Sequence, residues 1–346
     1  MLNIGIIGFG RIGKVHARSI QTRVEDACVL RVCDPFMNPE MEAEARKLGI
    51  MECGKDTQEL IQDPRLDAVL ICSSTHTHAA LSMEAAKAGK HIFCEKPIDP
   101  DPKRIVEVIT AVKQAGVHFQ VGFNRRFDHN FKALRQAVEQ GRIGDPHFIT
   151  VVSRDPEAPS LDYVKVSGGM LMDMTIHDFD MVRYLSGSEV TEVYAAGAAL
   201  VNPRIRELGD IDSAQITLRF ENGAIGCISN SRRAAYGYDQ RAEVFGSKGS
   251  AATQNDTAST LILSDEQGIQ SEKPLYFFLE RYMQSFAEEI ISFTQAIREN
   301  KPTAVGGADG LIPVLMAKAA AKSMHEHRPV TIAEIKQEEG IEDVES

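Results

Sequence analysis

The chain has 346 residues, 43% of them hydrophobic, and its 49 acidic against 38 basic residues give a formal net charge of -11. This length exceeds the usual range for a single hydrophobic core, so we expect two domains. No long basic run tracks a phosphate backbone, no apolar run approaches the roughly 18 residues that span a bilayer, and Met1 leads straight into a strand pattern; we therefore expect a cytoplasmic protein without nucleic-acid or membrane partners.

Strand-like and helical segments alternate over residues 1–122. The strand-like segments are LNIGII, VLRVC, LDAVLICSS, HIFCEKP and HFQVGF, and the helical ones include THAALSMEAAKAG and PKRIVEVITAVKQAG. Such alternation is typical of βαβ units. It predicts an α/β domain with a doubly wound parallel sheet.

Three glycines follow the first strand-like segment, at positions 8, 10 and 13. The first allows a tight turn, the second lets the backbone approach a pyrophosphate, and the third lets a helix pack closely on the strand. Arg11 and Ile12 open that helix, whose free N–H groups would face a diphosphate. An ordinary glycine-rich turn gives the same short pattern, but an acid stands 21 positions after Gly13, close to the expected spacing. We therefore predict a dinucleotide site.

Asp34 is that acid, and it ends the segment VLRVCD. Its carboxylate is expected to accept hydrogen bonds from the ribose hydroxyls and to repel a 2'-phosphate, which favours NAD over NADP; a turn acid before Pro35 is the alternative. Ser73, Ser74 and Thr75 follow another strand-like segment and are expected to line the cofactor groove, unless they serve only the turn.

Glu95, Lys96 and Pro97 end the segment HIFCEKP. Ligands of open α/β sheets bind at the carboxyl ends of parallel strands, so Glu95 is expected beside the cofactor and Lys96 at the reaction site. A lysine there can bond to a hydroxyl or neutralise an alkoxide. The alternative is a surface lysine before a proline turn.

After Phe123 the regular alternation of strand-like and helical segments ends, and strand candidates predominate. A helix is expected near 127–140, then a helix at 169–185 among strand candidates, and two helices at 279–299 and 310–326; the strand candidates are HFITVVSRD, EVTEVYAAGAAL, SAQITLRF, AIGCISNS, AEVFGS and TLILS. This predicts an α+β domain over 123–334 with an open, largely antiparallel sheet. One face of such a sheet needs a cover of helices or of another subunit, which predicts a homo-oligomer. Residues 335–346 are acidic and are expected to form a solvated tail.

Asp173, His177 and Asp180 stand at helical spacing and are expected to share one face of the helix at 169–185. His177 can exchange a proton near neutral pH, with Asp173 orienting it, although a solvated polar face has the same spacing. Further groups suited to binding hydroxyls are Arg125, Arg126, Asp155, Tyr236 and Tyr238, with a surface pair for the arginines and strand packing for the tyrosines as the alternatives. No C-x-x-C occurs and the paired histidines have no cysteine partners, so we predict no metal site and reduced, buried cysteines.

The glycine motif, Glu95-Lys96-Pro97 and Asp173-x-x-x-His177 occur in that order, and together they resemble the glucose-fructose oxidoreductase / inositol dehydrogenase (Gfo/Idh/MocA-like) family from Asn3 to about Val330. Within it, SRDPEAP, MDMTIHDFDMVRYL and YGYDQRAEVFGSKG look most like the inositol 2-dehydrogenase group. The resemblance implies that Lys96 contacts the reacting hydroxyl, that His177 is the general base and that Asp173 supports it. The implied polyol contacts are Arg126, Asp155, Asp180 and Tyr236.

The expected reaction is the NAD-dependent oxidation of a ring secondary hydroxyl, with C2 of myo-inositol as the implied position and a homotetramer as the implied assembly. Another cyclitol, or an aldose oxidised by the same residues, is the first alternative. A protein that senses NAD without turnover is the second, and it would have no need of both Lys96 and His177.

Overall fold

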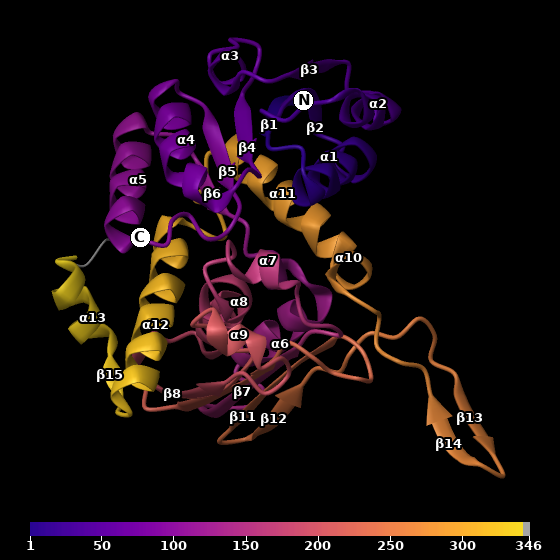
Figure 1. The fold of residues 1–346 in the computed structure, drawn as a ribbon, viewed down its shortest axis with the longest axis vertical. Helices are drawn as coiled ribbons and strands as arrows, with labels where there is room; N and C mark the ends of the chain where they lie inside the picture. The colour runs from indigo at the N-terminus through magenta and orange to yellow at the C-terminus, as the bar shows by residue number, and fades with distance from the viewer. Residues whose placement is uncertain (342–346) are drawn as a thin grey trace. The chain divides into compact units, whose positions relative to one another are not determined.

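The structure, a computed structural model, describes residues 1–341 and divides them into two units (Figure 1). The first unit combines Met1–Phe127 with Met283–Val314 and residues 339–341. The second combines Asp128–Tyr282 with Leu315–Glu338. This arrangement differs from the single division expected after residue 122, because late segments of the chain return to the first unit.

A six-stranded parallel sheet forms the centre of the first unit, in the order β3-β2-β1-β4-β5-β6. The apolar stretches predicted as strands form it, and the short β3 adds an edge strand that the sequence pattern did not indicate. The bounds are β1 Leu2–Ile7, β2 Ala27–Cys33, β3 Glu52–Gly54, β4 Ala68–Ile71, β5 His91–Cys94 and β6 Phe119–Val121.

Helices lie on both sides of this sheet, with α4 and α5 packed together on the left in Figure 1 and α1 and α2 on the right. Asn38 and Asp101 cap α2 and α5 by accepting hydrogen bonds from backbone N–H groups, and a proline follows each cap. The bounds are α1 Arg11–Arg23, α2 Pro39–Lys47, α3 Thr57–Ile61, α4 Thr75–Lys87, α5 Pro102–Ala115 and a 3₁₀ turn η1 Asn124–Phe127.

Helix α11 (Met283–Glu299), expected in the second domain, belongs to the first unit. It packs on α1, and its Ile290 and Phe293 are fully buried in the core around β1 and β2. Helix α12 (Gly307–Glu326) follows, with its residues up to Val314 in the same unit. A parallel sheet must be covered on both faces, and the order of elements along the chain does not indicate which helix supplies the cover.

A seven-stranded sheet forms the second unit, in the order β12-β11-β7-β10-β9-β8-β15. Its pairs are antiparallel except for β7 with β10, which run parallel, so the predicted largely antiparallel sheet is confirmed. The bounds are β7 Pro146–Arg154, β8 Val190–Ala198, β9 Ser213–Phe220, β10 Ile225–Ser231, β11 Asp239–Gly246, β12 Gly249–Ala252 and β15 Val330–Thr331.

Side chains alternate between the two faces of this sheet, as the period of a strand requires. Helix α8 covers the inner face at β7 and also packs on α6. The outer face exposes large apolar side chains, at Phe148, Tyr194, Ile225 and Phe245. The helices of this unit before residue 283 are α6 His129–Glu139, α7 Leu161–Val164, a π-helical turn η2 Leu171–Thr175, α8 Ile176–Ser186, α9 Arg204–Glu207 and α10 Phe278–Arg281.

A separate hairpin, β13 Ile262–Asp265 with β14 Gly268–Ser271, projects from the second unit at the lower right of Figure 1. All residues of both strands are exposed. Two strands without a packed face are marginally stable in water. The exposed apolar side chains of this hairpin are Ile262, Leu263 and Ile269.

The segment expected as a solvated tail, 335–346, begins inside helix α13 (Ile332–Glu339), in which Ile335 is buried. Arg328 and Lys322 bond to Glu334 and lower the pKa of its carboxyl group to about 2. The prediction of a tail rested on the acidic composition and did not take account of Ile332 and Ile335, three residues apart, which are the buried residues of this helix. Residues 342–346 lie outside the described residues.

Candidate active site

Each glycine of the loop between β1 and α1 has a different local geometry. Gly8 has a φ of +92°, and a Cβ there would lie 2.5 Å from the Ser73 nitrogen. A Cβ at Gly13 would lie 1.9 Å from the Gly8 oxygen, whereas a Cβ at Gly10 would meet no atom within 4 Å. The loop therefore turns at Gly8, packs at Gly13 and leaves open space at Gly10.

Helix α1 starts directly after this loop, with Arg11 and Ile12 as its first residues. Gly10 precedes the helix and has no side chain that could accept hydrogen bonds from the first N–H groups. Those groups carry the partial positive charge of a helix N-terminus. The open space at Gly10 and the positive end of the helix fit the diphosphate of a dinucleotide.

The Asp34 carboxylate lies against the same loop. It accepts hydrogen bonds of 2.8 Å from the N–H groups of Phe9 and Phe36, one on each oxygen. A carboxylate has about four acceptor positions, so both oxygens keep capacity for the hydroxyls of a ribose. The two backbone bonds fix the carboxylate beside Gly8 and Gly10, and its charge disfavours a phosphate there.

Ser73 and Ser74 lie between β4 and α4, and Thr75 is the first residue of α4. The Ser73 and Thr77 hydroxyls lie 2.6 Å apart, and Ser74 is the residue before the first helical residue, Thr75. The Ser73 carbonyl contacts the His78 Nε2 at 3.0 Å. The predicted groove residues thus lie at the carboxyl end of β4, next to β1 in the sheet.

His78, which the sequence analysis did not single out, joins this segment to the turn that carries Lys96. Its Nδ1 lies 2.8 Å from the Pro97 carbonyl, and its side chain is buried. Burial lowers the pKa of His78, against the two carbonyl contacts, which raise it. The spacing of His78 within a helix gave no signal of this role, because its partners come from two other segments.

Glu95, Lys96 and Pro97 follow β5 directly, and the Lys96–Pro97 peptide bond is cis. The Glu95 carboxylate lies 2.7 Å from the His16 Nε2, and Lys96 is half-buried. Arg126, in η1, donates a hydrogen bond of 2.7 Å to Asp309, also in the first unit. Its guanidinium is therefore already bound to a carboxylate, which the sequence did not indicate.

In the second unit, the expected regular helix over 169–185 is interrupted. Asp173 lies in the π-helical turn η2, and His177 lies in the first turn of α8. A π turn contains more residues than an α turn, so the spacing rule that placed Asp173, His177 and Asp180 on one face does not hold across it. Asp180 is buried, 3.9 Å from Arg183.

Arg232 brings together two of the predicted site residues, Asp155 and Asp173. It lies 2.8 Å from the Asp173 carboxylate and 3.4 Å from that of Asp155. Tyr163 donates a further hydrogen bond of 2.9 Å to Asp173. Burial lowers the pKa of Arg232, but the two carboxylates outweigh it and the pKa is raised on balance.

Sequence reasoning missed Arg232, although it stands in the segment NSRRAAYGYDQ that supplied Tyr236. Its position at the end of β10, beside the end of β7, gives it access to both acids. A second missed group ties α8 to the sheet: Asn230 donates to Asp178 at 2.9 Å and accepts from the Thr175 hydroxyl at 2.8 Å. For Arg232, the available signal in the sequence was a basic residue between two strand-like segments.

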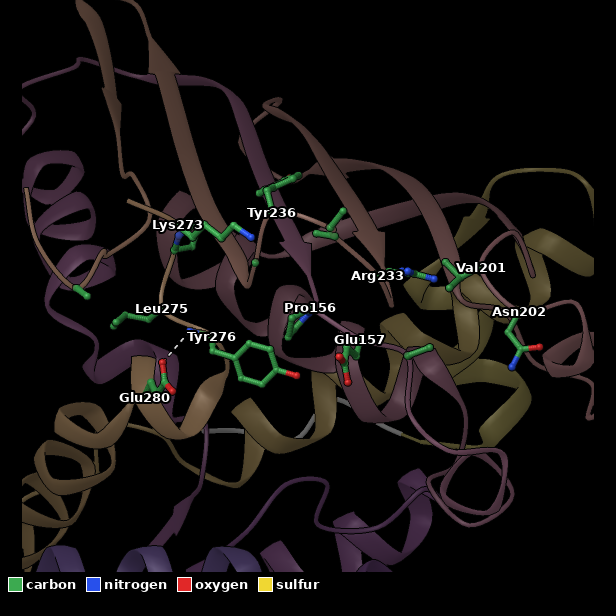
Figure 2. A pocket seen from close by; sticks show the side chains of 16 residues that line it. Pro156, Glu157, Val201, Asn202, Arg233, Tyr236, Lys273, Leu275, Tyr276 and Glu280 are labelled. Atoms are coloured by element: carbon green, nitrogen blue, oxygen red, sulfur yellow. Dashed lines mark hydrogen bonds between the residues drawn. The ribbon is translucent and has the colours of Figure 1, made fainter. Parts of the chain in front are cut away.

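Tyr236 has its own partners. Its hydroxyl donates to Asp239 at 2.5 Å and accepts from Arg154 at 2.9 Å. Burial, and then the bond to Asp239, raises the pKa of the Tyr236 hydroxyl. Tyr236 also lines a cavity of about 820 Å³ whose wall includes Pro156, Glu157 and Tyr276 (Figure 2).

One group of potential metal ligands occurs within residues 1–341: His16, Glu95 and Glu289. The six cysteines are all free thiols, and Cys33 and Cys94 are buried. Burial raises the pKa of Cys33 to about 11. None of the helices in the described part of the chain is both long and apolar enough to span a membrane.

The parallel sheet with its open glycine loop and fixed acid defines a dinucleotide-binding enzyme domain. The family model for the oxidoreductase family with an NAD-binding Rossmann fold matches residues 2–123, and the model for the GFO/IDH/MocA C-terminal domain matches residues 131–252. The chain belongs to the Gfo/Idh/MocA family of oxidoreductases, and its cofactor is NAD.

Two relatives match nearly the whole chain. Myo-inositol 2-dehydrogenase of Thermotoga maritima is 49% identical over 96% of this chain and 99% of its own length. Inositol 2-dehydrogenase of Rhizobium meliloti is 44% identical over the same shares of the two chains. A solved structure of scyllo-inositol dehydrogenase from Lactobacillus casei, with bound NAD(H) and scyllo-inositol, has a TM-score of 0.89 and 31% identity, covering 96% of this chain and 99% of that one. The predicted family, fold class and cofactor are confirmed.

Proposed function

We propose that the protein oxidises a ring secondary hydroxyl of a cyclitol with NAD as the hydride acceptor, and that myo-inositol is the substrate, giving 2-keto-myo-inositol. The observation that carries the proposal is the 49% identity to a myo-inositol 2-dehydrogenase over almost the full length of both chains. The fixed acids of the second unit support it, since many hydroxyls need many acceptors.

The proposed chemistry assigns one task to each residue. When bound, NAD supplies the acceptor for the hydride. His177 takes the proton of the reacting hydroxyl as general base, and the Lys96 ammonium stabilises the charge that develops on that oxygen. Asp173, held by Arg232 and Tyr163, supports His177.

Asp155, Asp180, Arg126 and Tyr236 remain the proposed hydroxyl-binding residues. The contacts of these residues sharpen the proposal. Asp180 lies beside Arg183, Arg126 binds Asp309, and Asp239 binds the Tyr236 hydroxyl, so each side chain is held in place before substrate arrives. A substrate without a hydroxyl at each matching position would leave such groups unpaired, which is costly.

A substrate panel tests the proposal. With NAD saturating, NADH formation is followed for myo-inositol, scyllo-inositol, glucose, sorbitol and glycerol. We expect the highest kcat/KM for myo-inositol and poor use of sorbitol and glycerol. Preference for an acyclic polyol, or NAD binding without turnover on any ring substrate, would refute it, and the second outcome would identify an NAD sensor.

Scyllo-inositol is the second candidate substrate, because the Lactobacillus casei structure that matches this chain holds it. The two isomers differ only in the orientation of one hydroxyl. A ratio of kcat/KM that favours scyllo-inositol would reassign the isomer and leave the residue roles unchanged. A preference for glucose would indicate an aldose dehydrogenase with the same chemistry.

We also propose a homotetramer that works in the cytoplasm. The outer face of the seven-stranded sheet exposes Phe148, Tyr194, Ile225 and Phe245, and the β13–β14 hairpin exposes Ile262 and Ile269. Large apolar side chains exposed together on one sheet face are typical of subunit interfaces. The free cysteines fit a reducing compartment. Light scattering of the purified protein tests the tetramer, and a monomeric mass contradicts it.

A further inference from the structure

Three ionisable side chains meet in the first unit, two of them completely buried and the third, Glu95, 12% exposed. His16 comes from α1, Glu95 from the end of β5 and Glu289 from α11, and one ligand atom of each lies within 4.8 Å of the other two. His16 and Glu289 are 0% exposed. The His16 Nε2 lies 2.7 Å from Glu95 and 3.9 Å from Glu289.

Glu289 is the unusual member of this cluster. Neither of its carboxylate oxygens has a hydrogen-bond partner among residues 1–341. Phe93 and Phe286 pack edge-on against the His16 ring, with centroids 5.1 and 5.7 Å away. An ionised carboxylate without a partner is strongly disfavoured in such surroundings, so the charge of Glu289 has to be neutralised.

The charges around Glu289 do not neutralise it. A protonated His16 balances Glu95, which is nearer, and leaves nothing for a second carboxylate. The Cys72 thiol, directly after β4, is partly buried, and burial raises its pKa; a thiol is neutral or anionic, so it supplies no positive charge. Gln120, on β6, bonds to the backbone carbonyl of Glu289 and not to its carboxylate.

A bound proton neutralises Glu289 better than a metal ion does. A divalent cation needs the lone pair of the His16 Nε2, and that atom is already at hydrogen-bond distance from Glu95. His16 and Glu289 are completely buried, so a cation could reach only Glu95, whose side chain is 12% exposed, without opening the core. A proton needs neither an entry path nor a coordination shell.

We propose that Glu289 is a neutral carboxylic acid in the native protein and that it acts, with His16, as a positioning residue for Glu95 and the Lys96 turn. The positioning part rests on the proposed role of this turn in the reaction. The Glu95 carboxylate also packs over Gly122, where a Cβ would lie 3.1 Å from it, so it is held on two sides. Ionisation of Glu289 places a second negative charge next to Glu95 and displaces it.

The effect of pH on stability follows from this arrangement. Burial, and then the charge of Glu95, raises the pKa of Glu289 well above its ordinary value. A carboxyl group whose pKa is raised by folding contributes its stability below the pKa of the unfolded state, and the contribution is lost as pH rises towards the folded pKa. Wild type should therefore lose stability with rising pH relative to a variant that cannot ionise here.

The first experiment measures Tm against pH for wild type, Glu289→Gln and the control Glu288→Gln, which removes a charge from the neighbouring, half-buried position of the same helix. As pH rises above the pKa of a carboxyl group in the unfolded chain, we expect the Tm of wild type to fall relative to the Tm of Glu289→Gln. Glu288→Gln should follow the wild-type curve. A difference that does not change with pH overturns the neutral acid.

A second measurement uses wild type alone, so it stands even if Glu289→Gln does not fold. The infrared C=O band of a protonated carboxylic acid should persist at neutral pH. Its absence, or a stoichiometric divalent metal found by elemental analysis, overturns the proposal. Neither result depends on turnover, so a wrong substrate assignment does not affect this test.

The positioning role needs a kinetic readout. In wild type, kcat/KM for NAD should fall by about tenfold per pH unit once a single group ionises, and Glu289→Gln should lack that alkaline limb. Glu288→Gln should retain it. An identical alkaline limb in wild type and Glu289→Gln overturns the positioning role. If no ring substrate is turned over, NAD affinity by fluorescence titration replaces kcat/KM in the same comparison.

Discussion

The glycine loop of the first unit and the Arg232 cluster of the second unit are built in opposite ways. The loop uses backbone groups of a single short segment, Gly8 to Gly13, to which the distant Asp34 carboxylate is hydrogen-bonded. The cluster uses side chains from separate segments, with Arg232 between Asp155 and Asp173. A backbone site depends on conformation, whereas a side-chain site depends on each functional group. The variants below test this contrast, because the effects on NAD and on the cyclitol should separate.

The largest effect is expected at His177. His177→Ala should lower kcat by about 100- to 10,000-fold, the usual range for loss of a general base, and should abolish the rising limb of the pH–rate profile. NAD affinity, measured by fluorescence titration, should stay close to wild type. His325→Ala, at an exposed position of α12, is the control. A variant that keeps the wild-type pH profile would remove His177 from the role of base.

Lys96 lies in the first unit but is expected to behave like a reaction residue. Lys96→Met keeps much of the side-chain length and removes the charge, so kcat should fall by about 100- to 1,000-fold through lost stabilisation of the developing charge. NAD should still bind with nearly normal affinity. Lys103→Met, at an exposed position of α5, is the matched control. Retention of more than about a tenth of the wild-type rate would contradict the role.

Arg232 should matter to the stability of the second unit as well as to the reaction. Arg232→Met removes the guanidinium that contacts two mostly buried carboxylates, and breaking a buried ion pair costs about 3–5 kcal/mol in the free energy of unfolding. Denaturant titration measures the loss. Arg233→Met, at the exposed neighbouring position, should cost little. Equal stabilities of the two variants would show that the cluster does not depend on Arg232.

Asp34 should set the choice of cofactor. Asp34→Asn keeps an oxygen that can accept from the Phe9 or Phe36 N–H groups but removes the charge. We expect the KM for NAD to rise by about 10- to 100-fold, the value of a hydrogen bond to a charged group, and the gap between NAD and NADP to narrow. Kinetics with both cofactors at a fixed cyclitol concentration measure this. Equal use of NADP and NAD by the wild type would refute the assignment.

The smallest effect is expected at Tyr236. Tyr236→Phe removes a hydroxyl that already has two protein partners, so the KM for the cyclitol should rise by only about 2- to 10-fold, as for one hydrogen bond, and the KM for NAD should not change. Tyr276→Phe changes another tyrosine in the wall of the same cavity and is the control (Figure 2). Equal effects of the two substitutions would argue for general packing of the cavity and against a hydroxyl contact.

The sequence by itself determined the elements that depend on neighbours along the chain. The glycine loop, the strand–helix alternation and the acid at position 34 are local patterns, and their conformations follow from backbone sterics and strand periodicity. The predicted parallel and largely antiparallel sheets are present for the same reason. The motif order also identified the family, because three spaced motifs rarely coincide by chance.

Tertiary structure alone decided which distant groups meet. Helix α11 returned to the first unit and brought Glu289 to His16, and the parallel pairing of β7 with β10 brought Arg232 to Asp155. A π turn at Asp173 interrupts the helix that was predicted to be regular. Helix α13, with a buried side, forms where a solvated tail was predicted. Which buried surfaces face one another and which buried charges pair are properties of the folded chain, and neither can be read from the spacing of residues along the sequence.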